Sequence, residues 1–102
     1  HYDIGFSIEN LVYFELLRRG YEVNIGKING TEIDFVAKKD GAYTYIQVSA
    51  SLIDESTFKR EITPLQNIHD NYEKFILTLD DYSEGNYNGI LIKNVINWLL
   101  EE

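Results

Sequence analysis

Two tight turns constrain the fold of this chain more than any other feature of its sequence. Asn29-Gly30 and Asp40-Gly41 are residue pairs that favour two-residue hairpin turns, and residues on both sides of them alternate between apolar and polar. Such alternation is typical of strands with one buried face. The sequence therefore predicts an antiparallel meander of three strands, over residues 21–28, 32–38 and 42–49.

The middle strand of this meander carries the most unusual residue. Strict alternation places Ile33, Phe35 and Ala37 on one face, and Glu32, Asp34 and Val36 on the other. Asp34 interrupts an apolar run, where an unpartnered carboxylate would lose much of its hydration energy. We expect it either to bind a metal ion or to be held by a polar partner such as Lys38 or Arg60.

A helix is predicted before the meander, over residues 7–19 or starting as early as residue 4. Ser7 is a candidate N-cap, and Gly20 is a typical residue just beyond a helix end. The face expected to be buried consists of residues at helical spacing, namely Ile8, Leu11, Val12 and Leu16.

The segments after the meander predict a second helix, two strands and a third helix. The second helix is expected over residues 54–69, capped by Asp54 or Ser56 and kinked or split at Pro64. Asn94 is a candidate cap for the third, whose buried side would contain Val95, Trp98 and Leu99. The remaining segments are strands at 74–79 and 89–93, an acidic loop at 80–88 and a helix at 94–102.

These elements predict one α/β domain over residues 1–102, with the order αβββαββα and a mixed sheet flanked by helices. The chain contains no methionine and begins at His1, so we expect it to be a fragment of a larger protein.

The charge and composition narrow the classes of function. The net charge of −8 argues against a free-standing nucleic-acid binder, whose affinity comes mostly from Lys and Arg on phosphates. No apolar run approaches the roughly 20 residues of a membrane-spanning helix, so no membrane association is expected. The absence of cysteine excludes disulfides and thiolate metal sites. We expect a cytoplasmic protein.

The sequence resembles a C-terminal domain of unknown function that follows the ATPase module in many prokaryotic AAA-type proteins. The resemblance rests mainly on GFSIENLVYFELLRRGYEV at 5–23, TEIDFVA at 31–37 and YIQVS at 45–49, and it continues through residues 60–65, 70–72 and 77–80. That family is similar to the PD-(D/E)xK nuclease superfamily, which has a restriction-endonuclease-like fold. The resemblance thus implies a nuclease-like fold and, as a partner, an ATPase module of the same parent protein.

The resemblance also implies a site made of Glu9, Asp34, Gln47 and Ser49. In active members, carboxylates at the first three positions bind Mg²⁺ or Mn²⁺, and a lysine stands where this chain has Ser49. Gln47 offers a neutral amide and Ser49 a hydroxyl, so this chain lacks one carboxylate and the ammonium. Glu9, Asp34 and Gln47 would be the metal ligands of any surviving site, and Gln47 can instead bond to the backbone or to Asp34.

Three functions remain open at this stage. The first is a catalytically degenerate nuclease-like accessory domain, which would not be an enzyme on its own. The second is a nuclease that depends on Mg²⁺ or Mn²⁺ and has a modified site. The third is a domain for oligomerisation or for docking a protein partner.

Overall fold

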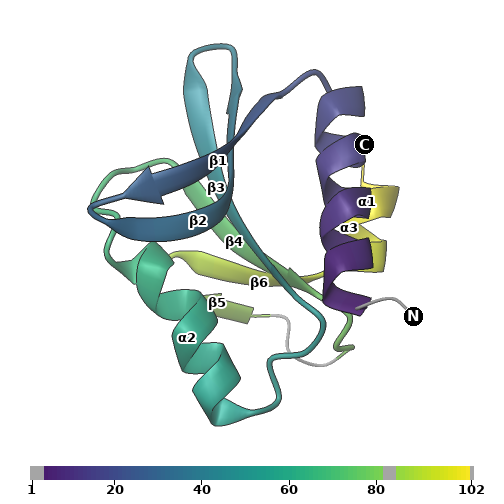
Figure 1. The fold of residues 1–102 in the computed structure, drawn as a ribbon, viewed down its shortest axis with the longest axis vertical. Helices are drawn as coiled ribbons and strands as arrows, with labels where there is room; N and C mark the ends of the chain where they lie inside the picture. Colours follow the sequence, from purple (N-terminus) through teal and green to yellow (C-terminus); the bar gives the residue numbers. More distant parts are fainter. Residues whose placement is uncertain (1–3, 82–84, 102) are drawn as a thin grey trace.

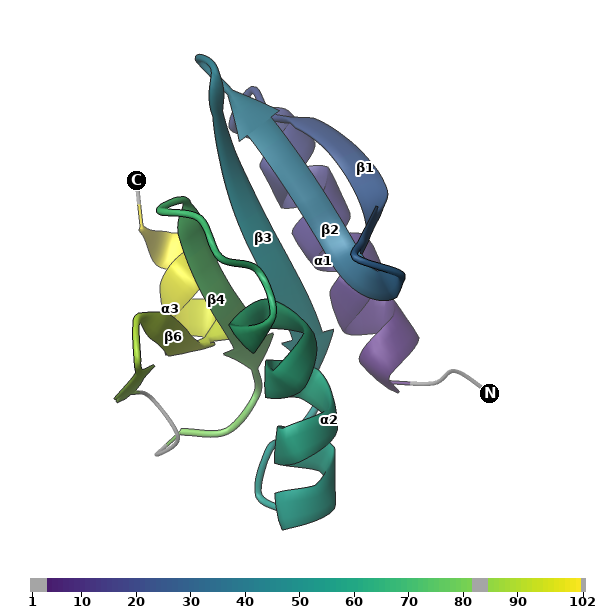
Figure 2. The same cartoon turned by 90° about the vertical axis from the view of Figure 1, so that its left-hand side faces the viewer.

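The computed structural model describes residues 4–81 and 85–101, and for residues 4–7 the backbone alone. A six-stranded sheet forms the middle layer of the fold (Figure 1). Helices α1 (Ile4–Arg18) and α3 (Val95–Leu100) cover one face of this sheet, and α2 (Glu55–Gln66) covers the other (Figures 1 and 2). The expected mixed α/β architecture is therefore confirmed.

The sheet has the order β1-β2-β3-β4-β6-β5. Its central pairs, β3 with β4 and β4 with β6, are parallel, and the other pairs are antiparallel. The predicted meander is present. The strands are β1 (Glu22–Ile28), β2 (Thr31–Lys39), β3 (Ala42–Ser49), β4 (Glu73–Thr78), β5 (Gly85–Tyr87) and β6 (Ile90–Asn94).

The predicted loop at 80–88 and the predicted order αβββαββα are wrong in one respect: residues Gly85–Tyr87 form a short edge strand, β5. It pairs with β6 through the two-residue turn Asn88-Gly89. Both turn residues have positive φ angles, 56° and 94°, as do the two residues at each of the predicted hairpin turns. Positive φ at both central positions is the geometry of the turn that best matches the twist of a hairpin. Residues 82–84 of the predicted loop lie outside the described part of the chain.

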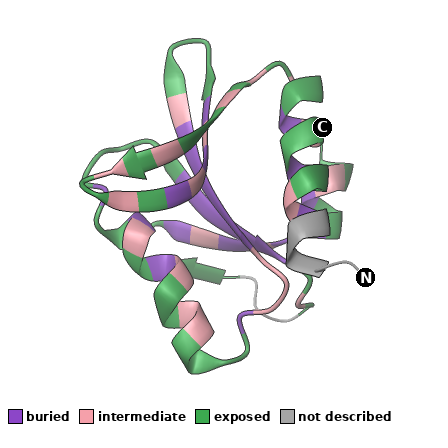
Figure 3. Cartoon of the chain, viewed as in Figure 1, coloured by how far each residue is buried: buried purple, intermediate pink, exposed green. Residues whose placement is uncertain are grey.

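Each face of the sheet buries its own apolar cluster. Figure 3 shows that buried residues run along the central strands of the sheet. The cluster beneath α1 and α3 contains Val12, Leu16, Ile46, Leu77 and Trp98, among others. The cluster beneath α2 contains Ile33, Tyr45, Leu65, Ile76 and Ile92, among others. Because both faces of the sheet are covered, consecutive residues along β3 and β4 are buried.

Two expectations about helix faces and ends need correction. Leu11 is 47% exposed, so it does not share the buried side of Ile8, Val12 and Leu16. Helix α2 is continuous through Pro64 and ends at Gln66 rather than residue 69. Pro64 lies in the last turn, where it removes one intrahelical N–H bond without ending the helix.

The predicted caps are mostly confirmed. The Asp54 carboxylate accepts a hydrogen bond from Ser56 N at 3.1 Å, and the Asn94 side chain accepts one from Asn97 N at 3.0 Å. Gly20 follows α1 with a φ of 92°, as expected of a residue that ends a helix. The side chain of Ser7, the other predicted cap, lies outside the described set. Among the described residues, no helix combines the length and apolar character needed to cross a membrane.

The alternation predicted for β2 fails at Asp34. Pairing with β1 runs regularly from Glu22 to Asn24, and it resumes with Gly26 opposite Ile33. Residues 34 and 35 of β2 thus lie opposite residue 25 of β1 alone, which is a β-bulge. As a result Ile33 packs in the α2 cluster, whereas Phe35 packs in the α1 cluster.

Candidate functional site

The bulge places Asp34 where β2 and β3 separate. The ladder between these strands reaches only to Phe35 opposite Ile46. Beyond that pair, the Asp34 side chain bridges the strands, because Asp34 Oδ2 accepts a hydrogen bond from Val48 N at 2.9 Å. The partner of this carboxylate is therefore the β3 backbone. Of the two cations considered from the sequence, Lys38 lies over the ring of Tyr43, and Arg60 lies beside Glu61.

The Gln47 side chain on β3 forms a second hydrogen bond to β2, in which β3 supplies the side chain and β2 the backbone group. Its side chain is buried, with the residue only 4% exposed. Gln47 Oε1 accepts a hydrogen bond from Asp34 N at 2.8 Å, and Gln47 Nε2 donates one to Glu61 O at 3.2 Å. One amide group therefore connects β2, β3 and α2. The expectation that the Gln47 amide bonds to the backbone is therefore confirmed, at Asp34 N.

Glu61 is the residue that the sequence did not single out. It lies on α2, its backbone carbonyl holds Gln47, and its side chain is 18% exposed. Burial, followed by the negative charges of Asp34 and Glu9, raises the pKa of Glu61 to about 7. The guanidinium of Arg60, with 3.9 Å from Nε to Glu61 Oε2, offsets only part of this rise.

The pKa of Asp34 is also raised by its environment. Burial raises the pKa of the Asp34 carboxyl, the Val48 N–H opposes the rise, and the charge of Glu32 adds to it. Asp34 and Glu61 therefore both bind a proton more readily than exposed carboxyls. No motif around Glu61 signals this, because its proximity to Asp34 arises from the packing of α2 on the sheet.

The other two predicted residues lie around the same end of β3, which Figure 2 shows between α1 and α2. Ser49 ends β3, and its hydroxyl donates a hydrogen bond to Ser51 O at 2.9 Å. Glu9 lies on α1 and is partly buried, and its charge contributes to the raised pKa of Glu61. The fold thus brings carboxyl groups from α1, β2 and α2 within electrostatic range of one another.

In this arrangement the Gln47 and Asp34 side chains form hydrogen bonds that connect β2, β3 and α2. Among the residues that the structure describes, no three His, Cys, Asp or Glu side chains gather closely enough to hold a metal ion. The Gln47 amide oxygen accepts from Asp34 N and Asp34 Oδ2 accepts from Val48 N, so both bonds link β2 to β3 beyond the end of their ladder. The Gln47 amide nitrogen donates to Glu61 O on α2. The raised pKa values of Asp34 and Glu61 mean that these carboxyl groups hold a proton to a higher pH than exposed carboxyls do.

The comparison with known proteins gives an uncharacterized relative and no matching family. No family model matches the chain. The chain is 43% identical over 94 residues to an uncharacterized protein of Haemophilus influenzae. This alignment covers 92% of the chain and 23% of the relative. The chain therefore corresponds to less than a quarter of the length of the protein that it matches.

Proposed function

We propose that this domain is a nuclease-like module that has lost its own cleavage chemistry. In this proposal it serves as an accessory interaction domain of a longer, ATP-binding AAA-type protein. The resemblance of residues 5–23, 31–37 and 45–49 to domains of that type supports this proposal. So does the greater length of the Haemophilus relative. The chain carries no Gly-x-x-x-x-Gly-Lys loop of its own, so ATP would bind elsewhere in such a protein.

The side chain of Gln47 carries the argument for lost chemistry. At a position where an active nuclease needs a charged metal ligand, this chain has a neutral amide that holds Asp34 N and Glu61 O. At the position of the expected lysine, Ser49 has a hydroxyl that bonds to Ser51 O. A hydroxyl cannot stabilise the negative charge that develops on a phosphate during cleavage as an ammonium does.

Glu61 favours a second candidate, a metal-dependent nuclease with a modified site. Its carboxyl group lies within electrostatic range of Asp34 and Glu9. A divalent cation would displace the proton that the raised pKa of Glu61 favours, and Glu61 would supply the carboxylate that Gln47 lacks. A third role, oligomerisation alone, has no comparable support in the site.

The two leading candidates are separated by Mn²⁺ titration, followed by amide NMR on the wild-type chain, Asp34→Asn and Glu61→Gln. Asparagine keeps an oxygen that can accept the Val48 N–H, so the fold survives while the charge is lost. For the proposed degenerate module, we expect no signal to broaden selectively around residues 9, 34, 47 and 61. Selective broadening that both variants abolish would favour the metal-dependent nuclease.

Cleavage assays provide the second measurement. Branched and single-stranded DNA should remain intact with Mg²⁺ or Mn²⁺ for both the wild-type chain and Asp34→Asn. Efficient cleavage by the wild type, lost in Asp34→Asn and unaffected by Glu22→Lys on the distant edge strand, would overturn the proposal.

A further inference from the structure

An apolar groove lies beside the β5 edge of the sheet, on the face covered by α2. It has a volume of about 230 Å³. Ile53 is 74% exposed at its rim, and Tyr87 and Phe58 meet edge to face with ring centroids 5.0 Å apart. The residues that line it are Leu52, Ile53, Glu55, Phe58, Tyr87 and Ile92. A groove of this kind suits one large aliphatic side chain.

Among the residues that the structure describes, no strand pairs with the outer edge of the strand next to this groove. β5 is the last strand of the sheet and pairs on one side with β6. Its three residues are exposed, and Figure 3 draws the strand in green. A strand at a sheet edge presents backbone N–H and C=O groups that another extended chain can bond. The groove and the edge strand together therefore provide side-chain and main-chain recognition.

The charge around the groove is negative. Glu55 is the charged residue among those that line it, and Asp54 precedes it at the cap of α2. Asp80 adjoins the same corner, because its carboxylate accepts a hydrogen bond from Leu52 N at 2.6 Å. A ligand with a cationic side chain next to its apolar one would complement these carboxylates.

From these observations we infer that β5 and the groove bind an extended segment of a partner protein. The segment adds a strand to β5, places an aliphatic side chain in the groove, and directs Lys or Arg two residues away toward Glu55. The spacing of two follows from strand geometry, because alternate residues lie on the same face. This inference names the partner's chemistry for the interaction role proposed above and rests on that proposal.

A second copy of the chain is the less favourable occupant. Each copy carries a net charge of −8 and would bring its own carboxylates to the groove of the other. Like charges brought together in an interface oppose association. A segment that carries Lys or Arg has the opposite sign and is attracted instead.

The test uses the capped peptide Thr-Leu-Thr-Arg-Thr as the probe, titrated into the ¹⁵N-labelled chain. We expect amide shifts at residues 52–58 and 85–92. A peptide with Glu in place of Arg should bind about tenfold more weakly, and N-methylation of its backbone should abolish binding. Shifts confined to α1 or β1, or none at millimolar peptide, would overturn the inference. Concentration-dependent shifts at β5 without peptide would assign the edge to a second copy and also overturn it.

A charge exchange tests the orientation of the peptide. Glu55→Lys should weaken the Arg peptide about tenfold and strengthen the Glu peptide, whereas Glu22→Lys, on the opposite edge, should change neither. If Glu55→Lys and Glu22→Lys had equal effects, the attraction would come from the net charge of the chain alone. That result would contradict binding of the peptide in the groove. Residues 9, 34, 47 and 61 take no part in this titration, so its failure is distinguishable from a surviving metal site.

Discussion

At the scale of single residues, the main feature is Glu61, a half-buried carboxyl whose pKa is raised to about 7. A carboxyl that is mostly hidden from water and near two others costs free energy when it ionises. Glu61 meets both conditions, through its burial and through the charges of Asp34 and Glu9. The opposite case is Glu15, where hydrogen bonds from Arg18 and Arg19 lower the pKa to about 2.

The raised pKa of Glu61 predicts that stability falls as the pH rises through 7. The folded chain holds this proton more tightly than the unfolded chain, whose Glu61 has a pKa near 4.5. The stabilisation is therefore complete below about pH 4.5 and is lost as the pH rises through about 7. Its size is on the order of 2 kcal/mol. Urea unfolding at pH 5 and pH 8.5 measures it.

Glu61→Gln provides the comparison for this pH effect. Because the amide cannot ionise, we expect the variant to be about 1–2 kcal/mol more stable than the wild type at pH 8.5 and similar to it at pH 5. Glu15 does not interfere, since its contribution is lost only as the pH falls from about 4.5 through 2. An equal loss of stability at both pH values would instead mean that the Glu61 carboxylate has a favourable partner.

At the scale of elements, the bulge in β2 sets the site, and Gly26 on β1 permits it. A Cβ atom at Gly26 would lie 2.1 Å from Val36 Cγ2, closer than real carbon atoms approach. The β-branched valine side chain has little rotamer freedom with which to move away. The close approach of β1 and β2 beside the bulge therefore requires glycine at this position.

Gly26→Ala should destabilise the fold by about 1–3 kcal/mol, because β1 must move away from β2. Replacing Val36 with alanine removes the methyl groups that the new Cβ would meet, and so tests whether this clash causes the loss. In the double variant with Val36→Ala, the loss should be at least about 1 kcal/mol smaller than the sum of the single losses. Chemical denaturation of the four chains provides this cycle. Asn24→Ala, exposed on the same strand, should change stability by less than about 0.5 kcal/mol. Simple additivity would show that the contact with Val36 is not the reason for glycine.

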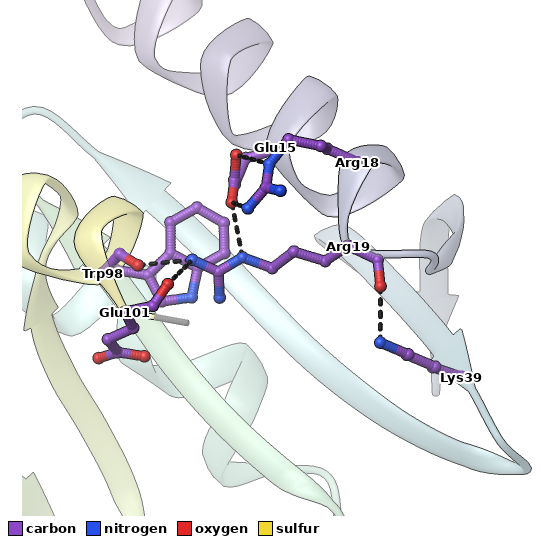
Figure 4. A network of polar contacts seen from close by, with 6 residues as sticks. All are labelled: Glu15, Arg18, Arg19, Lys39, Trp98 and Glu101. Carbon is purple, nitrogen blue, oxygen red and sulfur yellow. Dashed lines mark hydrogen bonds and ion pairs between the residues drawn. The ribbon is translucent and has the colours of Figure 1, made fainter.

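At the scale of the whole molecule, Arg19 joins the first helix to the last (Figure 4). Arg19 Nη2 donates hydrogen bonds to Trp98 O at 2.6 Å and Glu101 O at 3.2 Å. The guanidinium carbon lies 4.3 Å from the centre of the Trp98 ring, and Arg19 Nε donates to Glu15. One side chain thus binds the carbonyl end of α3, some 80 residues further along the chain.

Arg19→Ala should lower the free energy of unfolding by about 2–3 kcal/mol, because two carbonyl acceptors and the Trp98 ring lose their cation. Lysine should recover only part of the loss, since an ammonium cannot span the carbonyls and Glu15 together. Urea unfolding followed by Trp98 fluorescence measures both variants. The control is Arg18→Ala, which removes an ion pair with Glu15 whose arginine is exposed and which should cost no more than about 1 kcal/mol. Equal losses for Arg18 and Arg19 would contradict a specific role for the α3 contact.

Local signals in the sequence predicted the helices, five of the six described strands and several of their ends. The turns at Asn29-Gly30 and Asp40-Gly41 form, and Asp54 and Asn94 cap their helices, because turns and caps depend on a few neighbouring residues. The same turn signal was present in Asn88-Gly89. Strand β5 was nevertheless missed, because its three exposed residues show no buried alternation.

The sequence by itself predicted only part of the candidate site. Asp34 stood out because an acid in an apolar run needs a partner, while Glu9, Gln47 and Ser49 came from the resemblance alone. Which partners Asp34 has was decided by tertiary structure. The bulge depends on the pairing of two strands. The hydrogen bond from Gln47 to Glu61, and the electrostatic influence of Asp34 on Glu61, depend on the packing of α2. Neither is a property of neighbouring residues, so only the folded chain brings Glu61 within electrostatic range of Asp34 near the end of β3.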